Sequence, residues 1–252
     1  MTAEQTAIAK VTEPSIAVER VSKRYGDKVV LNEVDLTIDK GTIYGLIGPS
    51  GAGKTTLVKM FVGMETADSG LVKVLGRKMP NLSLLQEIGY MAQSDALYNE
   101  LTGEENLQFF ASLFKLRKQE QKERIGYAAD LVNLKNELKK KAGAYSGGMK
   151  RRLSLAIALI QNPKLLILDE PTVGIDPELR LSIWNELLRL KQEEGKTIIV
   201  TTHVMDEAER CDELAMVREG QILATGTPGQ LKSAYDARNL EEVFLRAGGK
   251  RS

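Results

Sequence analysis

Cysteine and histidine are almost absent from this sequence, which contains one of each, Cys211 and His203. A single cysteine excludes an internal disulfide framework and is typical of proteins from a reducing compartment. It also excludes a cysteine-rich zinc site, and a single histidine argues against a zinc site built on imidazoles. We therefore expect Cys211 to be an inert buried thiol in a protein that is stabilised by its core.

The sequence also lacks an excess of either charge and any long apolar run. Its 35 Lys and Arg residues balance 34 Asp and Glu residues, which gives a formal net charge of +1. This balance offers no general electrostatic attraction to nucleic acid, so we expect no nucleic-acid partner. No segment approaches the roughly 18 apolar residues that predict a membrane-spanning helix. Residues 1–14 lack the apolar segment of a secretory signal and are predicted to be a flexible leader, so a membrane role would require a partner.

The order of apolar patterns predicts an α/β fold in a chain of 252 residues, a length that fits one or two domains. Residues 15–20 and 29–38 alternate apolar and polar side chains around a turn at 25–27, as the half-buried strands of an antiparallel lobe do. Farther along, apolar strands alternate with helices, which predicts a mostly parallel sheet covered on both faces. The segments are a strand at 42–47, a helix at 55–63, a strand at 164–168, a helix at 178–191, a strand at 197–201, a hairpin at 215–224 and a helix from 227.

The middle of the chain has a different, helical character. From 104 to about 141 the apolar residues recur at helical spacing, first at Leu107, Phe110, Ala111 and Phe114. We interpret this region as part of a helical subdomain, about residues 94–150, inserted into a domain that spans 15–245 and precedes a short tail at 246–252. The alternative is that these are two further helices that cover the same sheet.

A glycine-rich segment between the predicted strand at 42–47 and the predicted helix at 55–63 has the pattern G-x-x-x-x-G-K-[ST]. The segment reads Gly48-Pro49-Ser50-Gly51-Ala52-Gly53-Lys54-Thr55, and Thr56 continues the predicted binding segment. Such a loop directs backbone N–H groups at phosphate oxygens, and the helix N-terminus adds a partial positive charge. Lys54 supplies a cation for the outer phosphates, and the Thr55 hydroxyl is a ligand for Mg²⁺. The pattern predicts a site for ATP and Mg²⁺.

Two acids follow the apolar strand at 164–168. Because ligands of open α/β sheets bind at the carboxyl edge, Asp169 is placed to hold Mg²⁺ through a water. Glu170 points the opposite way along the strand and can polarise an attacking water. Many strands end in Asp or Glu, so this pair is informative only together with the phosphate loop.

A third motif, Tyr145-Ser146-Gly147-Gly148-Met149, opens the next helix and places a serine and two glycines where an anion can bind. Lys150, Arg151 and Arg152 follow in the first turn, where cations oppose the helix dipole. One interpretation is that this helix end meets phosphate. The alternative is an ordinary serine cap with ion-paired basic residues.

Together these motifs resemble those of the ATP-binding subunits of ABC transporters, over nearly the whole chain from Ile16 to about Leu245. They follow the family's order along the chain, which makes the set more specific than any one motif. By this resemblance, Tyr25 corresponds to the aromatic residue that stacks on adenine. Gln93 corresponds to the glutamine that contacts Mg²⁺ and the attacking water. Taken alone, Tyr25 could also be a strand-end aromatic residue and Gln93 a surface glutamine.

The resemblance also implies residues that act between two subunits. Ser146, Gly147 and Gly148 resemble the signature that binds the γ-phosphate of ATP held by the other subunit. Asp176 resembles the aspartate of the loop that crosses between the two sites. His203 resembles the histidine that contacts the γ-phosphate, although a lone histidine is often just a hydrogen-bonded core residue. These assignments predict a catalytic set of Glu170, His203 and Gln93.

The signature departs from the family's commonest form, Leu-Ser-Gly-Gly-Gln, at its first and last positions, Tyr145 and Met149. A thioether cannot replace the hydrogen bonds of an amide, so contacts ascribed to that glutamine are in doubt. The Tyr-Ser-Gly-Gly-Met form resembles the branch of exporters that handle drugs, lipids and polymers.

The predicted function is Mg²⁺-dependent ATP hydrolysis that powers export through integral membrane subunits, from the cytoplasmic face of the cell membrane. Two copies, or one copy and a paralogue, would enclose two ATP molecules head to tail. The alternatives are an importer motor, a soluble ABC-type ATPase of DNA repair or translation, and a nucleotide sensor without turnover. Because Glu170 and His203 fill both catalytic positions, they argue against a sensor.

The predicted docking surface for the membrane subunits is a groove between the core and the helical subdomain, next to Gln93. The segment 94–110 carries Leu97, Tyr98 and Leu101 in a predicted loop, where exposed apolar side chains favour a protein partner. The alternative is that these three side chains fold back into the core.

Overall fold

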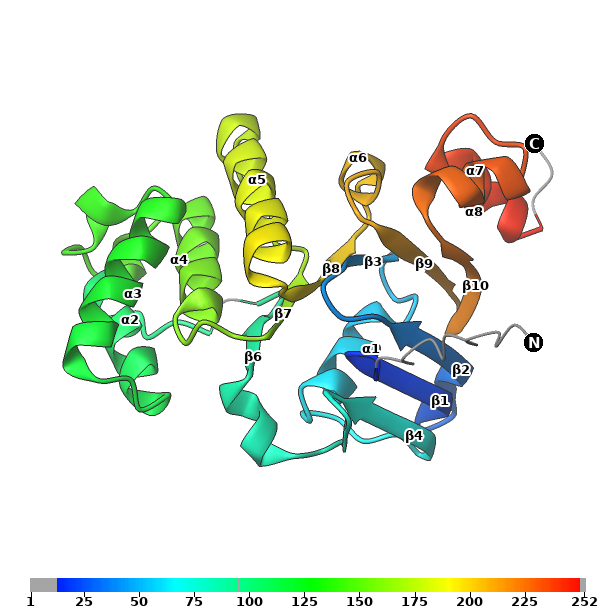
Figure 1. The fold of residues 1–252 in the computed structure, drawn as a ribbon, viewed down its shortest axis with the longest axis horizontal. Helices are drawn as coiled ribbons and strands as arrows, with labels where there is room; N and C mark the ends of the chain where they lie inside the picture. Colours follow the sequence, from blue (N-terminus) through cyan, green and yellow to red (C-terminus); the bar gives the residue numbers. More distant parts are fainter. Residues whose placement is uncertain (1–12, 95, 250–252) are drawn as a thin grey trace, which may run out of the picture.

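A computed structural model describes residues 13–94 and 96–249 and has a six-stranded sheet at its centre (Figure 1). The strands are β3 (Ile43–Ile47), β6 (Ile88–Met91), β7 (Leu165–Asp169), β8 (Thr197–Thr202), β9 (Glu213–Arg218) and β10 (Gln221–Gly226). Their order is β10-β9-β3-β8-β7-β6. The pairs from β9 to β6 are parallel, and β10 pairs antiparallel with β9. The carboxyl ends of five strands therefore share one edge.

The second sheet is antiparallel and is built largely from the N-terminal strands. Its members are β1 (Ile16–Tyr25), β2 (Lys28–Ile38), β4 (Ser69–Val74) and β5 (Arg77–Lys78), in the order β2-β1-β4-β5. A two-residue turn joins β1 to β2, and Gly26 in this turn has a φ of 57°, which glycine adopts without a steric penalty. The predicted strands at 15–20 and 29–38 are thus one hairpin, in which the first strand is longer than predicted.

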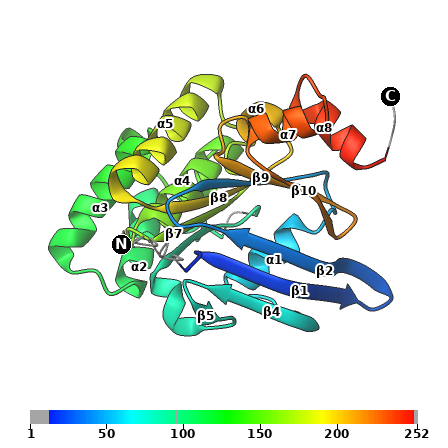
Figure 2. The same cartoon turned by 45° about the vertical axis from the view of Figure 1, so that its right-hand side comes forward.

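The central sheet is buried on both faces, as its apolar strands predict. On one face, Tyr44 and Leu46 of β3 pack with the antiparallel sheet and with α1 (Lys54–Phe61). On the other face, Ile43 and Ile47 pack in a second cluster with the remaining helices. Figure 2 shows α1 and the antiparallel sheet on one side of the central sheet and most of the helices on the other.

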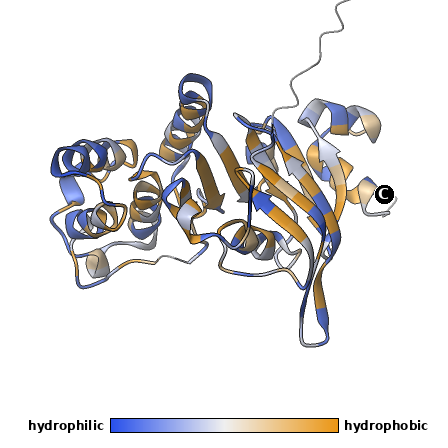
Figure 3. Cartoon of the chain, turned by 60° about the horizontal axis from the view of Figure 1, so that its bottom comes forward, coloured by the Kyte–Doolittle hydropathy of each residue, from blue (hydrophilic) through white to orange (hydrophobic). Residues whose placement is uncertain are grey.

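The helices differ in where they lie. The α-helices are α2 (Gly103–Leu113), α3 (Lys118–Leu131), α4 (Gly147–Leu159), α5 (Pro177–Glu194), α6 (Met205–Ala208), α7 (Pro228–Ala234) and α8 (Leu240–Ala247), and the 3₁₀ turns are η1 (Leu82–Gln86), η2 (Lys135–Glu137) and η3 (Ala142–Ala144). Figure 1 shows α2, α3 and α4 grouped beyond the β6 edge of the sheet. In Figure 3 the strands are mostly hydrophobic, whereas these outlying helices carry hydrophilic residues on their outer sides. This arrangement confirms the predicted α/β class with an antiparallel lobe and inserted helices.

One part of the helical prediction is wrong, because residues 132–144 do not continue a helix. Asn133 has a φ of 51°, a left-handed conformation that asparagine tolerates and that ends α3. Leu134 is then turned into the core, and only the short 3₁₀ turns η2 and η3 follow. The leucines of this stretch therefore pack from turns and not from one helical face.

The predicted division into a leader, a domain and a tail stays a prediction. Residues 1–12 of the predicted leader lie outside the described residues, and α8 runs two residues past the predicted domain end at 245. Among residues 13–94 and 96–249, no helix is long and apolar enough to cross a membrane.

Candidate functional site

The glycine-rich loop lies at the carboxyl edge of the central sheet, between β3 and α1. Gly48 leaves β3 against the neighbouring strand β9, where a Cβ atom at this position would lie 2.0 Å from the Val217 carbonyl oxygen. Gly53 precedes α1 with a φ of 110°, which L-residues rarely adopt. The two glycines let the chain turn tightly from the strand into the helix, so the free N–H groups of α1 face the loop.

Lys54 is the first residue of α1, and its side chain is folded back over the loop. Its ammonium group donates to the carbonyl oxygens of Gly48 and Pro49, at 2.6 and 3.1 Å. Burial lowers the pKa of Lys54, while the nearby carboxylates of Glu170 and Asp169 act in the opposite direction. The cation is thus held beside the loop with two acids facing it.

Thr55 and Asp169 meet between α1 and the end of β7. The Thr55 hydroxyl donates to Asp169 Oδ2 at 3.0 Å, and the other carboxylate oxygen accepts from the Thr201 hydroxyl of β8. Asp169 is almost completely buried, so these two hydroxyls fix its orientation. Sequence reasoning did not identify Thr201, whose only signal was its place at the end of a β-branched strand.

Glu170 follows Asp169 with a φ of 54°, an uncommon left-handed conformation for this residue type. Its N–H donates to both the carbonyl and the hydroxyl oxygen of Thr201, at 3.1 and 3.0 Å. Its carboxylate lies 3.2 Å from His203 Nδ1 and accepts a long hydrogen bond of 3.5 Å from Gln93 Nε2. The structure therefore brings the three predicted catalytic residues together.

A cavity of about 230 Å³ lies beside the glycine-rich loop and reaches Glu170 and Gln93. It is lined by residues 50–56 of the loop and α1, by Gln93 and Glu170 at one end, and by Tyr25 at another. Lys28 and Val30, three and five residues after Tyr25, also line it. Sequence reasoning did not identify them, although Tyr25 and Lys28 pair directly across the β1–β2 hairpin.

The other predicted nucleotide-binding residues lie at helix starts and do not line this cavity. Ser146 caps α4 by accepting from the Met149 N–H at 3.2 Å, and Asp176 caps α5 by accepting from the Leu179 N–H at 3.0 Å. Gly147 follows Ser146 in the exposed start of α4, and a Cβ at Gly148 would lie 3.0 Å from the Gly174 carbonyl oxygen. The two helix starts are therefore close together on the surface.

The unusual residues of the signature serve packing. Tyr145 is buried, and its hydroxyl donates to the Glu137 carbonyl at 2.8 Å. Glycine at 103 makes room for it, because a Cβ there would lie 2.3 Å from the tyrosine hydroxyl. Met149 packs against the main apolar cluster. Both side chains therefore face the helices and leave Ser146 exposed.

The basic residues after the signature, for which phosphate contact and ion pairing were both left open, include Arg151 and Arg152, which donate to backbone carbonyls. The Arg151 side chain is buried and donates to backbone carbonyls of residues 92, 93, 169 and 170. Arg152 donates to the carbonyls of Val132 and Asn133, at 3.5 and 3.2 Å. The free carbonyls of neighbouring segments, and not a phosphate, satisfy these two cations.

The segment after Gln93 only partly follows the docking prediction. Tyr98 is about half exposed and stacks edge-on against Phe109, but Leu97 is partly buried against the core and Leu101 is only partly exposed. The buried Asn106 amide holds this loop by bonding to both the N–H and the carbonyl of Tyr98, at 2.9 and 3.0 Å. Sequence reasoning did not identify this role of Asn106.

Cys211 is buried as predicted, and burial raises the pKa of its thiol.

Comparison with known proteins agrees with this geometry. The chain is 42% identical over 227 residues to "Nod factor export ATP-binding protein I" of Burkholderia orbicola (strain AU 1054), covering 89% of this chain and 74% of that protein. It is 39% identical over 241 residues to "Probable multidrug ABC transporter ATP-binding protein YbhF" of Escherichia coli (strain K12), covering 93% of this chain but 42% of that protein. It is also 42% identical to "ABC transporter G family member 23" of Dictyostelium discoideum, of which it spans only 33%.

Solved structures show the same fold. An ATP-binding subunit of an ABC transporter superposes with a TM-score of 0.85 at 28% identity, over 92% of this chain and 99% of that one. A dimeric ATP-binding cassette in a post-hydrolysis state, bound to ADP and Pi, superposes with a TM-score of 0.79 at 25% identity, over 84% of this chain and 98% of that one. The family profile described as ABC transporter matches residues 31–173. From the motifs, the site geometry and this match, the chain belongs to the ABC transporter family, as one of its ATP-binding domains.

Proposed function

We propose that this chain is the ATP-hydrolysing subunit of a membrane exporter and that it acts as a head-to-tail dimer with two ATP molecules at the interface. One observation carries the proposal. The glycine-rich loop, Gln93, Glu170 and an aromatic side chain, Tyr25, line one cavity, and Asp169 lies next to it, bonded to the Thr55 hydroxyl that also lines it. The cavity is thus lined by groups suited to bind phosphate (the loop and Lys54), a metal ion (Thr55) and an adenine ring (Tyr25).

The chain's own residues account for binding. The loop N–H groups and Lys54 would hold the phosphates, and Tyr25 would stack on the base. The Thr55 hydroxyl and the Asp169 carboxylate, 3.0 Å apart, are hard oxygen ligands of the kind that Mg²⁺ prefers. Among the described residues there is no cluster of three or more His, Cys, Asp or Glu side chains able to hold a metal alone, which fits an ion shared with phosphates and water. Bound there, Mg²⁺ would neutralise phosphate charge.

Hydrolysis would follow from the position of Glu170. Its carboxylate accepts a proton from a water whose oxygen forms a bond to the γ-phosphorus, while the bond between that phosphorus and the β–γ bridging oxygen breaks to give ADP and phosphate. Gln93 would orient the water, and His203, 3.2 Å from the carboxylate, would contact the γ-phosphate. General-base catalysis of this kind is worth about 100-fold to 10,000-fold in rate.

Two observations support a dimer. Ser146 and Asp176 lie exposed at the starts of α4 and α5 and do not line the cavity that contains Lys54, so they do not contribute to that ATP site. Two helix N-termini with exposed caps form a surface that favours an anion. We propose that this surface completes the ATP site of a second copy or of a paralogue.

The proposed partners are integral membrane subunits, which would place the chain at the cytoplasmic face of the membrane. The support is an apolar groove of about 570 Å³ between the end of α1, η1 and β6 on one side and α2 and α4 on the other. Leu82 is 83% exposed and Leu113 is 61% exposed along it. An exposed apolar groove of this size favours a helical partner. The direction of transport is inferred from the relatives named for Nod factor export.

The test is the Glu170→Gln variant. Because the amide cannot accept the proton, we expect kcat to fall by about 100-fold or more while ATP still binds, so that an ATP-bound dimer accumulates. Turnover and size-exclusion chromatography with ATP and Mg²⁺ measure both effects. Glu219→Gln, in the exposed turn between β9 and β10, is the matched control. Wild-type turnover in Glu170→Gln, together with a monomer in ATP, would contradict the proposal.

A further inference from the structure

One guanidinium group connects the two segments that carry the catalytic side chains. Arg151 is the fifth residue of α4 and is only 7% exposed. Its Nη1 donates to the carbonyl oxygens of Ala92 and Gln93, at 2.7 and 2.9 Å. Its Nη2 donates to the carbonyl oxygen of Glu170 at 2.7 Å and also to that of Asp169. Each terminal nitrogen thus bonds to two consecutive carbonyls of one segment.

These two segments have no other direct backbone connection beyond the ends of their strands in the described structure. The parallel pairing of β6 and β7 ends with Met91 opposite Leu168. Gln93 and Glu170 lie two residues beyond that last pair, where the ladder no longer fixes their separation. The planar fork of arginine suits this position, because its donors diverge at fixed angles and can bond to two backbones at once.

The backbone at Glu170 requires such support. Its φ of 54° is an uncommon left-handed conformation, which persists where surrounding contacts hold both sides of the residue. On one side its N–H donates to Thr201 of β8, and on the other its carbonyl accepts from Arg151 of α4. Removing the guanidinium would free the second side. The carboxylate could then leave the position 3.2 Å from His203.

We propose that Arg151 is a positioning residue, which holds Gln93 and Glu170 in a fixed relation and ties both to α4. This inference rests on the proposed ATPase function. Because Ser146 caps α4, the same helix presents a signature residue at its start and holds the catalytic segments from its fifth residue. A shift of α4 when a second subunit binds would therefore be passed directly to Glu170 and Gln93.

The test compares Arg151→Gln and Arg151→Lys with Arg152→Gln in the full chain. Arg152 is one residue along the same helix, and it donates to Val132 and Asn133, away from the catalytic segments. We expect Arg151→Gln to lower kcat by about tenfold to 100-fold, as small displacements of catalytic groups do. KM and the ATP affinity should stay near wild-type values, because the loop at 48–55 is untouched. Arg151→Lys should fall in between, since one ammonium group cannot bond to both pairs of carbonyls.

A second readout separates positioning from a general structural role. Methylguanidinium, added to Arg151→Ala at concentrations that do not change its melting temperature, should raise kcat and leave Arg152→Ala unaffected. If the wild type hydrolyses ATP and the Arg151 variants keep the wild-type kcat, this inference alone is overturned. It would also be overturned if kcat, KM and ATP affinity all changed together, without rescue by methylguanidinium. A wild-type chain that binds but never hydrolyses ATP would overturn the proposed function and this inference with it.

Discussion

Tyr25 is held in place by two charged neighbours. Its hydroxyl donates to Glu65 at 2.6 Å, and the Lys23 ammonium lies 5.3 Å from the centre of its ring. Lys23 also forms an ion pair with Glu65 at 2.9 Å. Hydrogen bonds from Tyr25 and then from Lys23 lower the pKa of Glu65 to about 2. The carboxylate is therefore ionised at neutral pH and holds the Tyr25 ring, which is proposed to stack on the adenine of ATP.

A pH-dependent loss of stability should follow at this residue. Glu65 has a folded-state pKa of about 2, below its ordinary value of 4.5, so its contribution is complete above about pH 4.5 and declines as the pH falls toward 2. We expect Glu65→Gln to lower the free energy of unfolding at pH 7 by about 1–2 kcal/mol. The difference from wild type should shrink between pH 4.5 and the lowest pH at which wild type still folds.

Urea unfolding of both proteins at several pH values measures this difference. Glu19→Gln is the control, because the Glu19 carboxylate is exposed and lies 3.9 Å from Lys73. A gap between Glu65→Gln and wild type that is the same at pH 7 and pH 3.5 would contradict the assignment of the low pKa to Glu65.

Single residues differ in how far sequence predicted their roles. Tyr25, Gln93 and Glu170 were predicted and the structure places them on one cavity, but their roles in binding and hydrolysis stay predictions. For Arg151, sequence left open whether this helix end meets phosphate or carries ion-paired basic residues, because sequence gives the place of Arg151 on a helix and not its partners. Those partners are backbone carbonyls 18 to 59 residues away, and every residue type offers the same carbonyl. No side-chain pattern could have indicated such a contact.

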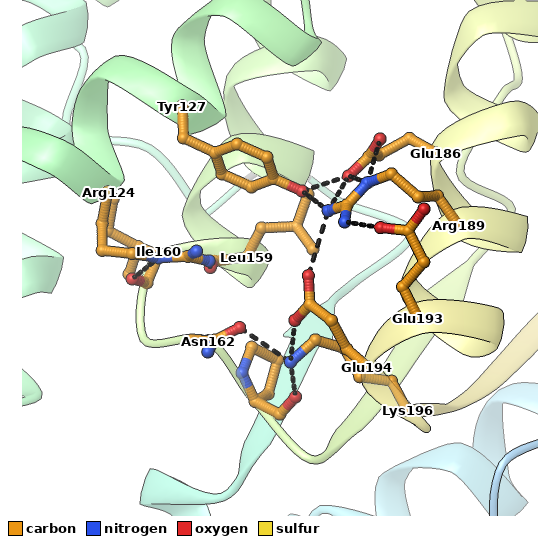
Figure 4. A network of polar contacts seen from close by, with 11 residues as sticks. Arg124, Tyr127, Leu159, Ile160, Asn162, Glu186, Arg189, Glu193, Glu194 and Lys196 are labelled. Carbon is orange, nitrogen blue, oxygen red and sulfur yellow. Dashed lines mark hydrogen bonds and ion pairs between the residues drawn. The ribbon is translucent and has the colours of Figure 1, made fainter.

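At the scale of elements, a polar network joins α3 to α5 (Figure 4). The Tyr127 hydroxyl of α3 donates to Glu186 of α5, and Arg189 of α5 donates to the same carboxylate. Arg124 of α3 donates to the carbonyls at 159 and 160, where α4 ends. The network thus ties the C-terminal half of α5 and the end of α4 to one helix. The opposite ends of α4 and α5 carry Ser146 and Asp176.

Removing one hydroxyl should weaken this junction. Burial and then the hydrogen bond to Glu186 raise the pKa of Tyr127 to about 12, so its hydroxyl is a neutral donor at pH 7. We expect Tyr127→Phe to cost about 1–2 kcal/mol, since the acceptor is charged and partly buried. In a chain of this size that corresponds to a fall of about 2–8 °C in the melting temperature.

Differential scanning calorimetry of the isolated chain measures this change. The control is Tyr98→Phe, whose ring is half exposed and contacts Phe109 through its edge. If both variants melt together with wild type, the hydroxyl contributes nothing and the junction depends on apolar packing alone.

Elements were predicted best where their sequence signal was local. The strands and helices around the glycine-rich loop and the acid pair match within a few residues, because apolar runs and caps mark their limits. β4 and β5 were missed, since β4 is defined by pairing with distant β1, as in Ile16 opposite Val74, and the two-residue β5 only by pairing with β4. The end of α3 at Leu131 was missed because Leu134, which is buried from a turn, continues the spacing of apolar residues that is typical of a helix.

At the scale of the molecule, the proposed ATP site and the apolar groove are lined by different residues of the fold. The parallel strands bring the glycine-rich loop and the acid pair to one edge of the central sheet, where the proposed ATP site lies. The apolar groove lies where α2 and α4 meet η1 and the end of α1. Gln93 is in the loop that leads from β6 to α2, so one connection serves both regions. Sequence predicted a docking groove between the core and the helical subdomain, but Leu97, Tyr98 and Leu101, which were predicted to lie on it, are not among the residues from 62 to 161 that line this groove.

A charge placed in the apolar groove should prevent a membrane subunit from covering it. Leu82→Asp and Leu113→Asp place a charge on either side of the groove, at exposed positions where folding does not depend on the leucine. Burying a carboxylate against an apolar partner helix is costly, so both variants should lose association with the membrane subunits. Leu245→Asp, exposed on α8 outside the groove, should keep this association.

Affinity purification from detergent-solubilised native membranes measures the association with the membrane subunits, and ATP binding by each isolated variant should equal that of wild type. Cross-links from Leu82→Cys to a cytoplasmic loop of the co-purified subunit would locate the contact. Assembly by both Asp variants at wild-type levels would place the docking surface elsewhere, because an apolar partner that covered the groove would have to bury a carboxylate in each variant.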